Sequence, residues 1–422
     1  MYKFEQKNQT KNEKSQFIFS LVNILFGVLN LYITTKFLES WQLNQYLFFM
    51  ILGSLISIFY NRISLTFTRL YASSFNKMDR ANNDSLLGIR KSSEIYLICF
   101  GVVYAIIFLT LLNLSEFFNI NILENITITL LIIFSFFFRS SYIYFQGVNK
   151  NYVSNYSQSL STIFITCLVL LSIFYFHSIL LLILSGFIGH LIIGIFLYLY
   201  LIKKENIFNG KYDPKISKIA MPLILRGYVA QLSQWGSFYI GSLIINSSYN
   251  FDLSNSVMIF TRILNILAGV GESFLAGNIS LLANIFSNNE LKKFHKLAIS
   301  LLKKIIFIIS VGLLSLILFS DYFVNLFQLN IYIPSQLIIL AVSSLWMIDR
   351  IQTQITGICS ASNKIYFLKE NIHSFFFVIL LSWISLYFYE SFLFFYITLL
   401  LPRILLLNIK PFYLYKNLIL NN

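Results

Sequence analysis

The chain has 422 residues, of which 57% are apolar, 18% aromatic and only 11% charged, and its formal net charge is +14. Soluble domains carry about 25% charged residues, so this composition excludes an ordinary soluble protein and indicates a membrane protein. The three cysteines are far apart, which excludes a disulfide framework and a cysteine metal site (Cys99, Cys167, Cys359).

Twelve segments are apolar and long enough to cross a bilayer, which takes about 20 residues each. They cover residues 17–38, 43–63, 94–114, 122–146, 157–176, 178–202, 217–245, 252–283, 299–320, 334–358, 366–389 and 391–416. Six precede a polar stretch and six follow it. We therefore expect an all-α membrane protein with an N-terminal six-helix half at 17–202, a linker at 203–216 and a C-terminal half at 217–416. Terminal segments at 1–16 and 417–422 flank the two halves.

Basic residues gather in alternate connections. The N-terminal segment, every second connection and the parts of the spans that adjoin them contain 26 of the 31 Lys and Arg residues. Basic loops stay on the cytoplasmic side, so we predict that both termini and the linker are cytoplasmic. The opposite connections are too short for an external catalytic or receptor domain. Stretches 61–93 and 285–300 follow the second span of each half, and we predict that both form short amphipathic segments on the inner leaflet.

Two stretches of the chain echo each other. Arg139–Tyr152 reads RSSYIYFQGVNKNY, and Arg350–Tyr366 reads RIQTQITGICSASNKIY. In each, an Arg inside an apolar run is followed by a Gly and then by Asn-Lys-x-Tyr. The two Asn-Lys pairs are 214 positions apart, about half of the chain. This offset predicts two repeated halves, as many transporter folds have.

With Arg62 and Arg403 counted among the cytoplasmic connections, we assign four arginines to the interior of predicted spans: Arg139, Arg226, Arg262 and Arg350. A charge at this depth costs at least about 2.5–3.5 kcal/mol and usually faces a bundle interior or a watery cavity. Snorkelling or a structural ion pair is the alternative, and for Arg139 and Arg226 the two interpretations balance. Arg262 and Arg350 are deeper, which favours a cavity. A guanidinium suits a phosphate or pyrophosphate because it binds two oxygens at once.

Acidic residues inside the spans are few. Asp349 precedes Arg350, and Glu272 lies in the eighth span. Neighbouring positions on a helix point about 100° apart, so Asp349 is expected to pair with another helix rather than with Arg350. Either acid is a candidate proton or sodium site. The alternative, favoured for both, is an ion pair that neutralises a buried Arg.

Motifs of enzyme chemistry are missing from the sequence. It contains no phosphate-binding Gly-rich loop, no His/Cys ligand cluster and no Ser/His/Asp arrangement. His190, inside the sixth span, is expected to make a hydrogen bond between helices. We therefore expect no enzyme activity, no cofactor, no metal and no nucleic-acid partner.

The layout of twelve spans, basic inner loops and buried Arg resembles the polysaccharide flippases of the multidrug/oligosaccharidyl-lipid/polysaccharide (MOP) exporter superfamily. The resemblance covers the whole chain and rests on segment Arg62–Lys91 and on the two echoing stretches. It implies alternating access that moves an undecaprenyl-pyrophosphate-linked oligosaccharide (an O-antigen or capsule unit) to the outer leaflet of the bacterial inner membrane. It also implies coupling to H+ or Na+, and partners in a polysaccharide polymerase and a chain-length regulator. Arg139, Arg226, Arg262 and Arg350 would hold the pyrophosphate in a cationic cavity.

Three alternatives stay open at this point. A cation-coupled multidrug exporter shares the expected fold, although its cavity would be lined with carboxylates. A lipid-II-type flippase is the alternative most similar in substrate. An O-antigen polymerase would need a large external loop, which this sequence lacks.

Overall fold

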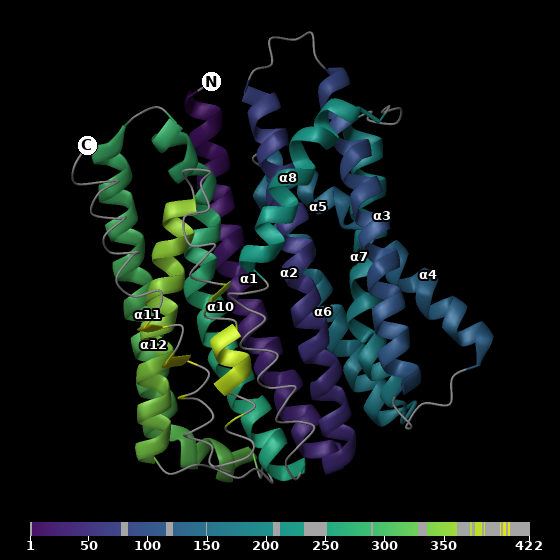
Figure 1. Ribbon diagram of the computed structural model, residues 1–422, viewed down its shortest axis with the longest axis vertical. Coiled ribbons are helices and arrows are strands. Elements are labelled where there is room, and N and C mark those ends of the chain that lie inside the picture. The colour runs from purple at the N-terminus through teal and green to yellow at the C-terminus, as the bar shows by residue number, and fades with distance from the viewer. Residues whose placement is uncertain are drawn as a thin grey trace. The chain divides into compact units, whose positions relative to one another are not determined.

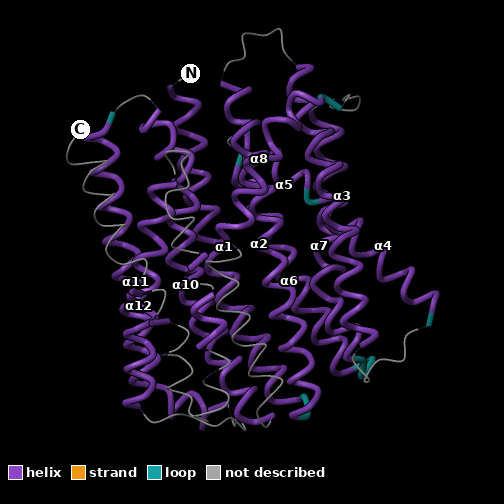
Figure 2. The backbone as a smooth tube through the Cα atoms, viewed as in Figure 1, coloured by secondary structure: helices purple, strands orange, loops and turns teal. Residues whose placement is uncertain are grey.

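The structure of the protein, a computed structural model, describes most of the chain (Figure 1). The described residues are 2–76, 83–114, 121–148, 150–205, 212–231, 251–287, 290–327 and 336–360, with scattered residues between 372 and 405. Every regular element in these ranges is an α-helix, joined by short loops (Figure 2). The predicted all-α class is confirmed for this part of the chain.

Among the described residues, six helical segments are long and apolar enough to cross a membrane: Lys14–Phe37, Leu86–Asn113, Ile122–Gly147, Asn151–Phe174, Ile179–Lys203 and Leu291–Phe319. A helix satisfies its own backbone hydrogen bonds, as lipid requires. The chain is therefore a multi-pass membrane protein. The predicted spans 366–389 and 391–416, and the second part of span 217–245, lie largely outside the described residues. The total of twelve spans and the cytoplasmic position of the termini stay predictions.

The chain divides into two compact units. Unit 1 is Met1–Phe26 with Ile56–Tyr228, and unit 2 is Gly27–Leu55 with Val229–Asn422. Unit 1 holds parts of α1 (Tyr2–Phe37), α2 (Ser40–Asn76) and α8 (Pro214–Gln231), and all of α3 (Asn83–Leu114), α4 (Ile122–Phe138), α5 (Ser140–Gly147), α6 (Asn151–Phe174) and α7 (Ile179–Glu205). Unit 2 holds the other parts of α1 and α2 with α10 (Phe251–Ser287), α11 (Leu291–Phe327) and α12 (Gln336–Ser360).

The units differ from the predicted halves in two places, since residues 27–55 belong to unit 2 and residues 217–228 belong to unit 1. Residues 27–55 group with unit 2 because they pack on α10. The Nδ2 of Asn44 donates to Oδ1 of Asn255 at 3.2 Å, and Nδ2 of Asn255 donates to the carbonyl of Ser40 at 3.0 Å. Asn44 and Asn255 are both buried, so these bonds join α2 to α10 inside unit 2.

The basic stretches do not form separate amphipathic segments, which corrects the sequence prediction. Helix α2 continues to Asn76 and α3 begins at Asn83, so most of stretch 61–93 belongs to two long helices. Helix α11 likewise begins at Leu291, inside stretch 285–300. Its first turns bury Phe294 and expose Lys292 and Lys296. The helices continue because their polar turns keep an apolar face toward the bundle.

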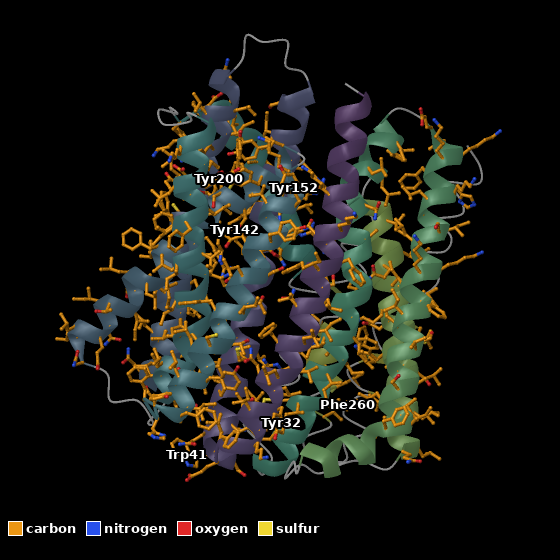
Figure 3. The ribbon with its side chains drawn as sticks, turned by 180° about the vertical axis from the view of Figure 1, so that it is seen from behind. Tyr32, Trp41, Tyr142, Tyr152, Tyr200 and Phe260 are labelled. Carbon is orange, nitrogen blue, oxygen red and sulfur yellow. The ribbon has the colours of Figure 1, made fainter. Side chains whose placement is uncertain are left out.

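Each unit has its own apolar core. In unit 1 the fully buried side chains include Phe67, Tyr71 and Phe145, from α2 and α5. In unit 2 they include Trp346 on α12, and Phe260 of α10 belongs to the same cluster (Figure 3). Aromatic rings bury about 150–250 Å² each, so these clusters dominate the packing of both units.

Polar contacts fasten the first part of α1 to α6 within unit 1. Nδ2 of Asn155 donates to Oγ of Ser15 at 3.0 Å, and Oγ1 of Thr162 donates to Oδ1 of Asn23 at 2.9 Å. Nζ of Lys11 lies 5.4 Å from the ring centre of Tyr152, which is labelled in Figure 3. The polar N-terminal segment is thus part of a helix that begins at Tyr2. It is the start of a packed helix and not a free tail.

The glycines of the two echoing stretches take equivalent positions in the structure. A Cβ on Gly147 of α5 would collide with the Cβ of Tyr71 on α2. A Cβ on Gly357 of α12 would lie 2.7 Å from a methyl group of Leu275 on α10. Helices α2 and α10 contain the second predicted span of each half. Both glycines therefore let the fourth span of a half approach its second span, which supports a repeat.

Candidate functional site

Arg139 sits at a break between two helices. Helix α4 ends at Phe138, α5 begins at Ser140, and Arg139 has φ −67° and ψ −13°. Its N–H donates to the carbonyl of Phe136 at 3.1 Å, and its own carbonyl accepts from the N–H of Tyr142 at 3.1 Å. The predicted span 122–146 is thus two helices that change course at the arginine, which turns this side chain toward α2.

Aromatic rings surround the Arg139 guanidinium. Its carbon lies 5.1 Å from the ring centre of Tyr60 on α2 and 5.0 Å from that of Phe136 on α4. Tyr104 of α3 and Tyr142 of α5 are also within electrostatic range, and both are buried (Tyr142 is labelled in Figure 3). Four helices thus contribute rings to one cation.

No carboxylate among the described residues pairs with Arg139, and its buried Nε has no hydrogen-bond partner among them. The buried acid of α3, Glu94, is already held by Arg90 at 3.0 Å and Lys91 at 3.6 Å. Contact with an aromatic ring stabilises a cation by about 0.5–2 kcal/mol. A charge inside the membrane costs at least about 2.5–3.5 kcal/mol. The two rings offset the cost only in part, so an anion beside the guanidinium would lower the remaining cost.

His190 lies in the same region. Its Nδ1 is 3.0 Å from Oγ of Ser161, which joins α7 to α6. The predicted hydrogen bond between helices is confirmed.

Arg350 has a different environment in unit 2. It is completely buried (0% exposed), and its Nη2 donates to Oδ2 of Asp349 at 2.9 Å. Its guanidinium carbon lies 5.6 Å from the ring centre of Trp346, one turn earlier on α12. The ion pair between neighbouring residues, which the sequence analysis disfavoured, is therefore present. Flexible side chains can bridge the angle between adjacent helix positions, and the two opposite charges attract each other more strongly where they are buried.

Of the remaining predicted site residues, only Arg262 has a side chain that the structure describes. Arg262 of α10 is partly buried, 5.8 Å from the ring centre of Tyr46, and its Nη1 has no partner among the described residues. Arg226 lies within α8 and Glu272 within α10, but their side chains fall outside the described part of the structure. Arg139 and Arg226 belong to unit 1, and Arg262 and Arg350 belong to unit 2.

Arg62 was missed by the sequence analysis, which counted it as a loop residue. It lies within α2, close enough to Arg69 for the two charges to repel. A Cβ on Gly227 of α8 would lie 2.7 Å from its Cδ, and its buried Nε has no partner among the described residues. Two signals in the sequence could have found it. Arg62 is inside predicted span 43–63, and Gly227 makes room on the opposing helix.

The sequence matches no protein-family model and no curated protein. Solved structures do match. A crystal structure of MATE in complex with MaL6 gives a TM-score of 0.70 at 13% identity, over 99% of this chain and 98% of that one. A MOP superfamily transporter from Pyrococcus furiosus gives 0.71 at 12% identity, over 98% and 96%.

An outward-facing multidrug resistance transporter of the MATE family gives a TM-score of 0.71 at 12% identity, over 99% of this chain and 97% of that one. Identities this low establish a shared fold and leave the substrate open. The chain therefore has, along nearly its whole length, the fold of the MATE transporters of the MOP superfamily.

Proposed function

We propose that the protein is a flippase that moves an undecaprenyl-pyrophosphate-linked oligosaccharide from the inner to the outer leaflet of a bacterial cytoplasmic membrane by alternating access. The observation that carries this proposal is the Arg139 cluster. It is a membrane-embedded cation in a ring of aromatic side chains, without a carboxylate partner among the described residues.

The chemistry of the cluster fits the head of such a lipid. A guanidinium binds phosphate oxygens in pairs and keeps its charge in a dry environment. The hydroxyl of Tyr142 is buried and has no partner among the described residues, so it can add a further hydrogen bond. Tyr60 and Tyr104 offer ring faces and hydroxyls, which suit a pyrophosphate joined to a sugar.

The four predicted arginines divide into different roles under this proposal. Arg139 is the main pyrophosphate ligand. Arg262 stays a candidate ligand, because its buried Nη1 has no partner among the described residues. Arg350 contributes only if its pair with Asp349 opens, because it is fully buried in this conformation. Arg226 stays a candidate from its place in α8. Asp349 and Glu272 are the candidate acids for H+ or Na+ coupling.

Among the matching structures is the Pyrococcus furiosus transporter, in which reverse polarity of the binding pocket suggests a different function. That precedent supports inferring a different substrate from the sign of the buried charges. A cation-coupled multidrug exporter is the second candidate, because a multidrug resistance MATE transporter shares the fold. Such an exporter should need buried acids where this chain has Arg139.

The test is deletion of the gene in its host, with complementation by wild type, Arg139→Ala and Arg139→Lys. We expect single lipid-linked units to accumulate in the inner leaflet, with loss of surface polysaccharide. Wild type should restore the polysaccharide and Arg139→Ala should not. Arg139→Lys should restore the polysaccharide partly, because lysine keeps the positive charge but lacks the planar guanidinium that binds two phosphate oxygens at once.

Other outcomes would overturn the proposal. Single, unpolymerised oligosaccharide units on the outer cell surface would indicate that the protein is a polymerase. Unchanged polysaccharide with altered tolerance of organic cations would indicate the exporter. Cell death with loss of cell wall would indicate a lipid-II-type flippase. Protein levels must be equal among the complemented strains.

A further inference from the structure

A groove on unit 1 borders the Arg139 cluster, with which it shares Tyr104. It has a volume of about 530 Å³, within the range of ligand pockets. One wall comes from α3 between Ile95 and Ile107, and the other from α8 between Ser217 and Tyr228. Ile63 of α2 contributes to the floor.

The groove opens sideways to the bilayer. Val103 and Leu225 on its rim are 54% and 49% exposed, whereas Ile63 and Ile224 at its floor are 1% and 2% exposed. The α3 wall lies inside the apolar span Leu86–Asn113, so the rim faces hydrocarbon. A surface that is hollow, apolar and exposed to lipid is filled in a membrane by a lipid chain.

The two ends of the groove differ in polarity. At one end Tyr96 and Ser217 share a hydrogen bond of 2.8 Å that joins α3 to α8. The first turns of α8 at this end expose Lys215 and Lys218. The carboxylate of Asp213 caps the helix by accepting from the N–H of Lys215 at 2.8 Å. The two exposed lysines outnumber the single carboxylate, so this end carries a net positive charge and attracts an anionic head group.

The length of the groove matches a single leaflet. Twelve residues separate Ile95 from Ile107, which is about 18 Å along a helix. Half of a bilayer core is about 15 Å. An acyl chain of one leaflet fills this length, whereas a long polyprenyl chain would extend well beyond it.

We propose that this groove binds an anionic phospholipid of the surrounding leaflet, with one acyl chain between α3 and α8 and the phosphate beside Lys215 and Lys218. The bound chain bridges α8 to α3 along the length of the groove. The lysines and the rim of this groove are not part of the Arg139 cluster, and the proposal does not depend on the flippase assignment.

The test is photolabelling of the full-length protein in nanodiscs with phosphatidylglycerol that carries a diazirine in one acyl chain. We expect labelled peptides from both walls of the groove. Leu225→Trp and the milder Val103→Phe fill it, and each should lower this labelling about tenfold. Ile106→Trp is the matched control, because Ile106 is 61% exposed on α3 and does not line the groove.

A second comparison tests the head group. Labelling by phosphatidylglycerol should exceed labelling by phosphatidylcholine about tenfold, and Lys215→Gln with Lys218→Gln should remove this preference. Lys292→Gln with Lys296→Gln, on exposed positions of α11, should leave it unchanged. Equal labelling of wild type and Leu225→Trp, or no preference between the two lipids, would overturn the proposal. Stronger displacement by polyprenyl phosphate than by phosphatidylglycerol would overturn the choice of occupant.

Discussion

Arg139 and Arg350 begin stretches of similar sequence, yet the structure gives them opposite surroundings. Arg139 stands at the break between α4 and α5 without a carboxylate partner in the described part of the chain. Arg350 lies inside the continuous helix α12 and is paired with Asp349. One neighbouring residue makes the difference, since Phe138 stands where Asp349 stands in the other stretch. A repeated motif can thus keep its packing glycine and still diverge in its electrostatics.

The largest effect is expected when the Arg350 pair is broken. Asp349→Ala leaves a buried guanidinium without its partner, which costs about 3–5 kcal/mol. We expect the purified protein to lose thermal stability and much of its yield. The double variant Asp349→Leu with Arg350→Met removes both charges and should recover most of the stability. Equal losses of thermal stability in the single and double variants would show that the pair of Asp349 and Arg350 does not stabilise this part of α12.

The packing glycines should differ in their tolerance of a methyl group. Gly147→Ala forces α5 away from Tyr71 and from the carbonyl of Thr68, at a cost of about 1–3 kcal/mol. Gly357→Ala meets only the flexible end of Leu275, so its cost should be well under that. Thermal unfolding in detergent measures both. A larger loss at Gly357 would contradict the packing described for α12.

The smallest effect is expected at the contact between α1 and α6. Thr162→Val keeps the shape and removes the bond to Asn23, for a loss of about 0.6 kcal/mol, typical of polar contacts between membrane helices. Val169→Ala in the same helix is a packing control. A Thr162→Val loss above that of Val169→Ala would show that the polar contacts are the main link to α1.

Membrane class and the cores of most spans could be predicted, because hydropathy alone reports burial in lipid. Helix ends could not be predicted well. Helix α2 continues thirteen residues beyond predicted span 43–63 to Asn76, and these polar turns have no hydropathy signal. The break at Arg139 is also unmarked, since neither Pro nor Gly stands there.

The candidate charged residues could be found from the sequence. The residues that pair with them could not. The pairing of Arg350 with Asp349 depends on side-chain conformations in a closed core. Burial of Arg62 depends on Gly227, which is 165 positions later in the chain. The apolar groove between α3 and α8 likewise depends on two helices that are far apart in the sequence.

We infer that Arg139 binds an anion, because no acid in the described part of the chain neutralises the charge of its guanidinium. Ser140 is buried beside it, and its hydroxyl has no partner among the described residues, so Ser140→Asp places a carboxylate next to the guanidinium. Ser140→Asn is the matched neutral control. The measurement is binding of an undecaprenyl-pyrophosphate-linked sugar to the purified protein in nanodiscs. We predict that wild type and Ser140→Asn bind alike and that Ser140→Asp binds at least about tenfold more weakly, a difference of about 1.4 kcal/mol. Equal binding by all three folded proteins would contradict the claim.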